Sequence, residues 1–337
     1  MDWFERLTGF AEESYDDTRN RLEVVGSELT SRVNGRSYGI GELELVSLKS
    51  LRELATRGDR LSGRLMVRNI SGDVRRMHQS SEYAGALFQV ASQFNLLEMV
   101  SPQVTPEQGV TRYQHDHTQG PACAIAAGAA TIYRNYFAPV GDGYGQTRAR
   151  QLDGLSDVGA ALGHALDQPV DALWAMRNGY ALCSREGLAA IGAYLRGLSA
   201  ADTDALRALL RVGAHRDVEV TDGEKPQRQV VSQVFCSALP VAYTSLPAVQ
   251  WKPFAQLVLE AAYEATLWAA VLNAQRNASN VVLLTRLGGG AFGNDDTWID
   301  AAMRRALMTV KDFRLDVRLV SYGAPPPTML ALENAFI

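Results

Sequence analysis

A glycine-rich loop stands within residues 283–295, which read Leu283-Leu284-Thr285-Arg286-Leu287-Gly288-Gly289-Gly290-Ala291-Phe292-Gly293-Asn294-Asp295. The apolar run at 281–285, just before the loop, is typical of a strand buried in a parallel sheet. After the loop, apolar residues recur with a spacing of four and predict a helix over 298–310. Residues 294–296 offer side chains that can cap this helix. The stretch therefore predicts a strand, a tight loop and a helix in direct succession.

The loop has the composition of an anion-binding turn. Glycine lets the backbone approach a ligand closely, and its N–H groups can converge on a phosphate beside a helix N-terminus. It is not a Walker loop, because no Lys-Ser or Lys-Thr pair follows, and its glycine spacing differs from the dinucleotide-binding fingerprint. A purely structural turn is the alternative, but three consecutive glycines lose much chain entropy on folding. We therefore interpret 288–294 as a diphosphate loop.

Strand and helix patterns alternate along the rest of the chain. Strand patterns lie at 61–70, 87–91, 230–236, 281–285 and 316–322. Helical patterns lie at 122–136, 149–198 as two helices, 202–212, 254–274 and 298–310. Residues 215–229 have the polar composition of a loop. This order predicts a mainly parallel sheet covered by helices on both faces, with ligands bound beyond the carboxyl ends of its strands.

Composition excludes several classes of partner. The chain has 337 residues, 47% of them hydrophobic, and a net charge of -4. Nucleic acid and anionic membranes attract clustered cations, so this charge predicts neither as a partner. The N-terminus lacks the basic start of a signal peptide, and no apolar stretch is long enough for a membrane span. Three irregularly spaced cysteines, Cys123, Cys183 and Cys236, favour free thiols, so we expect a cytoplasmic protein.

Three further segments are ordered around the loop. Gly72-Asp73-Val74 follows the first strand, residues 91–98 follow the second, and residues 116–125 open the alanine-rich helix. This order resembles a macrodomain, a family that binds ADP-ribose and in many members removes it from proteins. It is most similar to the divergent branch that includes bacterial effectors acting on ADP-ribosylated ubiquitin. The resemblance implies an α/β fold with a mixed, mainly parallel sheet flanked by helices.

The resemblance covers about half of the chain and sets the expected domain boundaries. Residues 1–60 would be a helical N-terminal extension, and residues 61–337 would form the macrodomain-like domain, with a helical insertion at about 138–228. The sequence departs from the family in two places. The usual run of three glycines in the first phosphate loop is replaced by Thr118-Gln119-Gly120-Pro121, and the Asn-Ala-Ala-Asn signature is absent.

The resemblance also implies particular ligand contacts. Asp73 would accept a hydrogen bond from the adenine amino group, and Phe292 would pack on the distal ribose. Asn95 would lie on the ribose side. The two phosphate loops would supply the remaining ligand-binding positions, namely Gln119, Gly120, Cys123, Gly288, Gly289, Gly290, Ala291, Gly293, Asn294 and Asp295.

Hydrolysis at the distal ribose carbon sets a further requirement. An oxocarbenium-like transition state needs a positioned water and a carboxylate that orients or deprotonates it. Glu98 and Asp116 stand on loops that we expect to face the pocket. With Asn95, they are the candidate catalytic residues. Asp295 and Asp296 are carboxylates too, but they can equally cap the helix.

Other reactive side chains have simpler explanations. Cys123 could act as a nucleophile at a helix N-terminus, but a small buried residue on an alanine-rich helix is the commoner case. His115 and His117 flank Asp116 without a third marked ligand, so we predict no metal site. Arg134 could reach a phosphate or form a structural ion pair. The sequence indicates no cofactor.

Two functions follow from these observations, and the sequence leaves both open. One is an ADP-ribosylhydrolase that removes ADP-ribose from a modified protein, with arginine as one candidate acceptor, or that cleaves an ADP-ribose derivative. The other is a non-catalytic reader or sensor of ADP-ribose or a related NAD metabolite, because the first phosphate loop departs from the family pattern. A nucleotide-binding structural protein that acts through its insertion is a third option. The expected partners are ADP-ribose or an ADP-ribosylated protein, in an oligomeric state left open.

Overall fold

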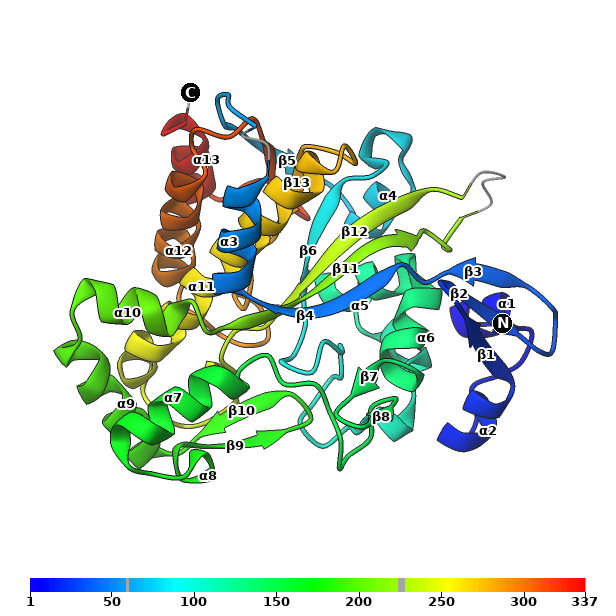
Figure 1. Cartoon of the computed structure of the whole chain (residues 1–337), viewed down its shortest axis with the longest axis horizontal. Coiled ribbons are helices and arrows are strands. Elements are labelled where there is room, and N and C mark those ends of the chain that lie inside the picture. Colours follow the sequence, from blue (N-terminus) through cyan, green and yellow to red (C-terminus); the bar gives the residue numbers. More distant parts are fainter. Residues whose placement is uncertain (59–60, 224–227, 337) are drawn as a thin grey trace.

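A seven-stranded sheet forms the centre of the molecule (Figure 1). The computed structural model describes residues 1–58, 61–223 and 228–336. Across the sheet the strands are β4 (Glu42–Ser47), β11 (Arg211–Glu219), β12 (Val230–Cys236), β6 (Leu87–Ala91), β13 (Val281–Leu284), β14 (Asp316–Ser321) and β5 (Met66–Ser71). From β12 to β5 all neighbours are parallel, whereas β11 pairs antiparallel with both β4 and β12. The predicted mixed, mainly parallel sheet is confirmed.

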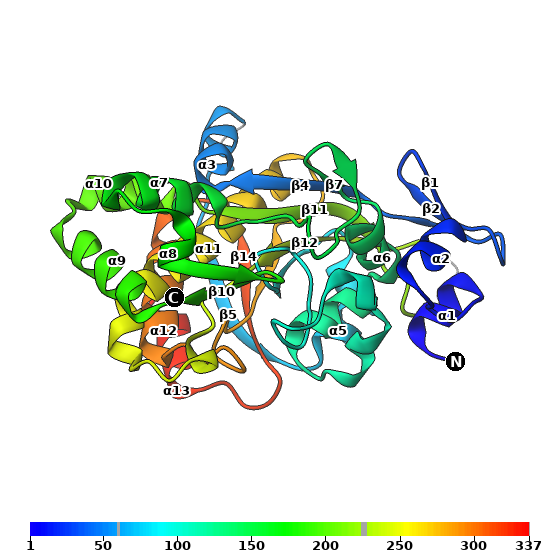
Figure 2. The same ribbon diagram turned by 90° about the horizontal axis from the view of Figure 1, so that it is seen from below.

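Helices cover both faces of the sheet (Figures 1 and 2). One face carries α3 (Leu48–Arg57), α11 (Ala248–Gln275) and α12 (Asp296–Thr309), and α9 (Arg185–Gly197) packs against α11. The other carries α4 (Val74–Gln79), α5 (Gln119–Ala126) and α6 (Gly128–Tyr136). Within β6, Leu87 joins the core under α11, while Phe88 and Val90 join the core under α5. Burial on both faces explains why β13 is a continuous apolar run and why β6 is apolar except for Gln89.

The N-terminal segment packs on α6. It contains α1 (Trp3–Thr8), α2 (Tyr15–Asn20) and an antiparallel sheet of β1 (Leu22–Val25), β2 (Glu28–Ser31) and β3 (Ser37–Gly39). Trp3, Phe4 and Leu7 share a hydrophobic core with Ala129 and Ile132 of α6. The segment thus combines the predicted helices with a small sheet that the sequence analysis did not anticipate.

Two strands of the central sheet come from segments that the sequence analysis placed outside it. β4 belongs to residues 1–60, and β11 belongs to residues 138–228. The expected boundaries therefore do not follow the sheet. The prediction of a polar loop from 215 is wrong, because β11 runs to Glu219 and fully buries the polar side chain of His215. Likewise α10 (Ala200–Arg207) ends before 212, where β11 has already begun.

The rest of the insertion contains helices and one hairpin. α7 (Ser156–Leu166) and α8 (Val170–Leu173) precede β9 (Trp174–Arg177) and β10 (Tyr180–Cys183), although only helices were predicted over 149–198. The predicted single helix at 122–136 is divided at Ala127 into α5 and α6. A short hairpin of β7 (Pro139–Val140) and β8 (Gly143–Tyr144) follows α6, and α13 (Pro327–Asn334) follows β14. No helix in the described ranges is long and apolar enough to cross a membrane.

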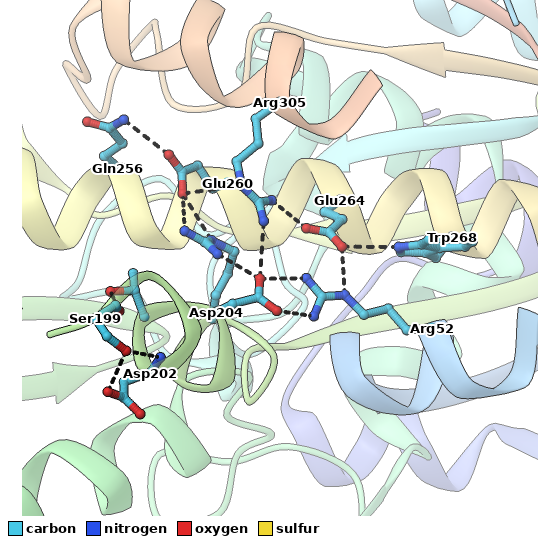
Figure 3. A network of polar contacts seen from close by, with 11 residues as sticks. Arg52, Ser199, Asp202, Asp204, Gln256, Glu260, Glu264, Trp268 and Arg305 are labelled. Carbon is cyan, nitrogen blue, oxygen red and sulfur yellow. Dashed lines mark hydrogen bonds and ion pairs between the residues drawn. The ribbon is translucent and has the colours of Figure 1, made fainter. Parts of the chain in front are cut away.

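A charge-balanced network joins the helices on the α11 face (Figure 3). Its arginines are Arg52, Arg207 and Arg305, and its carboxylates are Asp204, Glu260 and Glu264. The Glu264 side chain, which is 2% exposed, accepts from Arg52 Nε at 2.6 Å, from Trp268 Nε1 at 3.1 Å and from Arg305. Asp204 of α10 accepts from Arg52 Nη1 at 2.7 Å. The network ties α10 and α12 to α11, so Glu264 is expected to stabilise the whole helical layer.

We expect Glu264→Gln to lower the free energy of unfolding by about 3–5 kcal/mol. The buried Glu264 carboxylate is shared by the Arg52 and Arg305 guanidinium groups, and both would lose it. Urea unfolding measures this loss. Glu53→Gln is the matched control, since Glu53 is half-exposed and pairs with Arg57 only at 3.7 Å. It should change the free energy by less than about 1 kcal/mol. Similar losses in the two variants would contradict a structural role for the network.

The same network predicts a loss of stability in acid. Hydrogen bonds from Arg52 lower the pKa of Asp204 to about 2. Burial raises the pKa of Glu264, but hydrogen bonds from Arg52 and Arg305 outweigh it and leave that pKa below its usual value. These folded-state pKa values lie below the unfolded ones, so the stabilisation is complete above about pH 4 and is lost as the pH falls toward 2. Urea unfolding between pH 7 and pH 3 should show this decline, and Glu264→Gln should flatten it.

Candidate functional site

Two adjoining cavities lie beyond the carboxyl ends of the parallel strands. The first, of about 210 Å³, is here named the loop cavity, because its wall includes Gly288, Gly290, Ala291 and Phe292. The second, of about 680 Å³, is named the β5 cavity, because its wall includes Gly72 and Asp73 after β5 and Tyr322 after β14. The two share the wall residues Asp116, Thr118, Gln119, Thr285 and Arg286. The arrangement suits an elongated ligand that reaches from one cavity into the other.

The glycine-rich loop presents backbone donors to the loop cavity. It is closed by the Asn294 N–H, which donates to Gly288 O at 2.9 Å. In the described parts of the chain, the N–H groups of Gly290, Ala291 and Phe292 have no protein acceptor, and all three residues line the cavity. Successive free N–H groups form an anion-binding concavity, and α12 begins directly after the loop. The strand, tight loop and helix thus follow one another as predicted, and binding of a diphosphate at this loop stays a prediction.

Two side chains from other elements anchor the start of this loop. The Thr285 N–H donates to Gln89 Oε1 of β6 at 3.2 Å. The Tyr263 hydroxyl of α11 donates to Thr285 O at 2.7 Å and accepts from the Leu287 N–H at 2.8 Å. The loop is thus held from the sheet below and from α11 beside it. Sequence reasoning missed both residues, because each reaches the loop from a distant part of the chain.

We expect Gly288→Ala to destabilise the protein by about 2 kcal/mol or more. Gly288 has a φ of 74°, and an added Cβ would lie 2.5 Å from Ala238 Cβ, so strain and steric overlap both oppose the change. Gly290→Ala is the control, because its added Cβ meets nothing within 4 Å. It should shift the free energy of unfolding by about 1 kcal/mol at most. Equal losses in urea unfolding would show that the positive φ at Gly288 does not define the loop.

Glu98 is the buried acid of the cleft. It is 2% exposed and belongs to the wall of the loop cavity. Its main-chain N–H donates to the Tyr113 hydroxyl at 3.0 Å, and its Oε1 lies 3.5 Å from Arg134 Nη2. Its Oε2 has no hydrogen-bond partner among the described residues. Burial raises the pKa of Glu98 to about 7, although the charge of Arg134 acts against this shift. The carboxyl can therefore exchange a proton near neutral pH.

The two predicted aspartates of the cleft also support local turns. Asp73 lines the β5 cavity, and its Oδ1 accepts from the Arg75 N–H at 2.8 Å, which caps α4. Asp116 lines both cavities, and its Oδ1 accepts from the Thr118 N–H at 2.8 Å. In each case these hydrogen bonds engage Oδ1, so the second carboxylate oxygen is available to a ligand.

The start of α5 lies directly against the end of β6. Gln119 lines both cavities, but its Oε1 accepts from the Ala91 N–H at 2.9 Å and so extends the sheet. At Gly120 an added Cβ would lie 1.9 Å from Ala91 O, so only glycine permits this approach. Both residues form the wall that faces the glycine-rich loop.

Two predicted site residues lie away from the cavities. Asn95 is fully buried, and its side chain donates to Gln151 Oε1 at 2.8 Å and accepts from the Leu97 N–H at 3.1 Å. Cys123 packs in the core under α5, where burial raises the pKa of its thiol well above the usual value. The structure thus gives Asn95 a role in shaping the turn before Glu98, and it keeps Cys123 as a neutral thiol.

The end of the glycine-rich loop also turns away from the loop cavity. The Asn294 side chain donates to Leu239 O at 2.9 Å, and Asp295 caps α12 by accepting from the Thr297 N–H at 2.8 Å. Gly289 and Gly293 are likewise absent from the cavity wall as the structure describes it. These four residues shape the loop, while the residues between them face the cavity.

An aromatic cluster closes one end of the loop cavity. The ring of Tyr180, from the β9–β10 hairpin, lies 5.3 Å from Phe292 and 5.2 Å from Tyr243. The Tyr180 hydroxyl donates to Met99 O at 2.5 Å. Phe292 was predicted to face the ligand, but Tyr180 and Tyr243 were not. Tyr180 lies in a hairpin where only helices were predicted, and Tyr243 lies in a short turn after β12 that has no local motif. Tyr322 is a further missed residue, and at 89% exposure it stands free at the β5 cavity.

The fold and the cleft define an α/β protein with a crevice beyond the carboxyl ends of its parallel strands. A scan with models of known protein families gives no match, and a search of curated protein sequences gives none either. Among solved structures, the chain is similar to poly(ADP-ribose) glycohydrolase from Deinococcus radiodurans in complex with ADP-ribose, with 14% identity, a TM-score of 0.45, and coverage of 87% of this chain and 92% of that one. It is also similar to the Thermomonospora curvata glycohydrolase, with 13% identity, a TM-score of 0.42 and 96% coverage of both chains.

Proposed function

We propose that this protein binds ADP-ribose across the two cavities and hydrolyses the bond at the distal ribose. The observation that carries the proposal is the row of free N–H groups at Gly290, Ala291 and Phe292, three residues that line the loop cavity just before α12 begins. Such a row binds a diphosphate without any cation of its own. The Arg286 guanidinium lines the same wall and adds positive charge, although Asp300 and Asp296 already accept from it at 2.6 and 2.7 Å.

The rest of the ligand would follow from this anchor. The adenine would lie in the β5 cavity, where Asp73 can accept from its amino group and Tyr322 offers an exposed ring for stacking. The distal ribose would lie in the loop cavity, against Phe292 and near Glu98. This placement agrees with the contacts that the macrodomain resemblance implies.

Glu98 would act as the general base. A water oxygen forms a bond to the anomeric carbon of the distal ribose, while the bond to the leaving group breaks and the leaving group takes up a proton from solvent, to which Glu98 later returns the proton that it accepts. The water proton passes to the Glu98 carboxylate, whose Oε2 has no partner within the described residues. Asp116, on the shared wall, is the second candidate for this role. The substrate can be a protein that carries ADP-ribose, including one linked through arginine, or it can be a smaller ADP-ribose derivative.

Two assays on the same preparation test the proposal. Release of ADP-ribose is followed with proteins modified at arginine, at serine and at acidic residues, and with short poly(ADP-ribose). Calorimetry measures binding of ADP-ribose itself. We expect saturable binding and turnover of at least one substrate class. No binding would overturn the proposal as a whole.

The second candidate function is that of a reader, which binds ADP-ribose without hydrolysing any substrate. Its specific support is the position of Glu98, which is almost fully buried and already close to a guanidinium group. A buried carboxyl of this kind can be structural. Tight ADP-ribose binding together with no turnover of any substrate would select this reader function.

A further inference from the structure

Arg134 is an unusual cation, because it is fully buried and only partly paired. It lies on α6, and its guanidinium stacks 3.8 Å above the Phe235 ring. Its nearest carboxylate, Glu98, is 3.5 Å away, and its Nη1 has no hydrogen-bond partner in the described part of the chain. Burying a charge is costly unless it is paired and fully hydrogen-bonded. The folding of the chain alone therefore gives little reason for an arginine here.

The contacts of Arg134 converge on the turn that carries Glu98. Its Nε donates to Leu96 O at 3.1 Å, and its Nη2 donates to Thr131 Oγ1 at 3.1 Å and faces Glu98 Oε1. Leu96 has a φ of 64°, a left-handed conformation that a branched side chain seldom adopts. One guanidinium thus fixes both the strained residue and the carboxylate two positions later.

The ionisable groups around Glu98 come from several elements. Tyr113 contacts it from the turn before α5, and Cys123 lies behind it on α5. His215 on β11 lies beyond Arg134, and burial lowers its pKa well below the usual value, so it is neutral. The other ionisable side chains on the wall of the loop cavity are Asp116, Tyr180, Tyr243 and Arg286. Arg134 is the cation that approaches the Glu98 carboxylate to 3.5 Å.

We propose that Arg134 is a positioning residue, which holds the turn at Leu96 and keeps the Glu98 carboxylate available as a base in the loop cavity. The role in hydrolysis rests on the function proposed above. Two opposed effects act on the protonation of the Glu98 carboxyl group. Burial favours the protonated acid, whereas the guanidinium charge favours the carboxylate. Without the charge, Glu98 would keep its proton at neutral pH and could not accept one from water.

The test measures the protonation of Glu98 directly, in the free protein. Glutamate is labelled with ¹³C at the carboxyl group, and Glu98→Gln identifies the Glu98 signal in the NMR spectrum. In Arg134→Met, the titration midpoint of Glu98 should rise by about one pH unit or more, a tenfold gain in proton affinity. The acid limb of the pH–rate profile should move in the same direction. If Arg134→Met does not fold, Arg134→Gln removes the charge while keeping hydrogen-bonding capacity.

Arg207→Met is the matched control. Arg207 is also a buried guanidinium, but it pairs with Glu260 in the distant network, with Nη2 2.6 Å from Oε2. Its loss should weaken the fold and leave the Glu98 midpoint unchanged. An unchanged midpoint in both charge-removing Arg134 variants would overturn the proposal. Because the titration needs no substrate, a raised midpoint supports the positioning of the carboxylate even if the wild type hydrolyses nothing, a result that would remove only the proposed function.

Discussion

Glu98→Gln is expected to lower kcat by about 10²- to 10⁴-fold while leaving the affinity for ADP-ribose within about threefold, because a general base contributes to the transition state and little to binding. Glutamine keeps the shape of the side chain but cannot take a proton from water. Turnover of the preferred substrate and calorimetric titration with ADP-ribose measure the two effects. The variant also leaves Arg134 without its carboxylate, so its free energy of unfolding is recorded alongside.

Asp116→Asn is the matched comparison for this variant. Asp116 lines the same cavity, but its Oδ1 is already engaged by Thr118. We expect a loss of kcat of about tenfold or less, since a turn residue shapes the wall without accepting the proton. The reverse order, with a large loss for Asp116→Asn and a small one for Glu98→Gln, would transfer the role of base to Asp116.

Ala291→Asp is expected to weaken ADP-ribose binding by about tenfold or more. Ala291 is exposed at the centre of the loop, lines the loop cavity, and has a free N–H. A carboxylate there would repel the diphosphate. A tenfold loss of affinity corresponds to about 1.4 kcal/mol of binding free energy. Raising the salt concentration should reduce the difference between variant and wild type. Calorimetry with ADP-ribose and with adenosine measures the effect.

Two controls test whether the negative charge added by Ala291→Asp causes the loss of binding. Ala291→Ser adds one small polar group at the same position and should leave the affinity within about threefold. Adenosine lacks the diphosphate, so both variants should bind it as the wild type does. An Ala291→Asp protein that binds ADP-ribose normally would show that the diphosphate lies elsewhere.

The parts of the fold that could be predicted from the sequence are those with a local signal. β6 and β13 were recognisable because strands buried on both faces are short apolar runs. The glycine-rich loop and α12 were recognisable because composition and a spacing of four are local features. β4 and β11 were missed because one lies at the edge of the sheet and the other carries charged and polar residues along it. Their pairing depends on long-range contacts that no local pattern reveals.

The predicted site residues also fall into two groups, those that line the cleft and those that do not. The loop residues 290–292 and the acids Glu98 and Asp116 stand on loops that follow a strand or precede α5, and all of them line the cleft. Asn95 and Cys123 also stand near strand and helix ends, but their side chains point into the protein, where Gln151 and the core under α5 receive them. Side-chain direction depends on packing between distant elements, so spacing alone could not separate the two groups.

The supporting residues were beyond the reach of sequence reasoning. Tyr263 lies in a long helix whose two tryptophans, Trp251 and Trp268, are core residues, and only its hydroxyl contacts with Thr285 and Leu287 distinguish it from them. Tyr180 belongs to a hairpin whose turn packs against the segment before Glu98, through the Phe94 N–H that donates to Gly179 O at 3.0 Å. Each of these contacts joins segments that are far apart in the sequence, so no local pattern reveals it.

A crystal structure of the protein with ADP-ribose would show whether the glycine-rich loop binds the diphosphate. We expect diphosphate oxygens within about 3 Å of the N–H groups of Gly290, Ala291 and Phe292, with the distal ribose between Phe292 and Glu98. A ligand bound outside the cleft, or a diphosphate that leaves those three N–H groups without an acceptor, would contradict the proposed site.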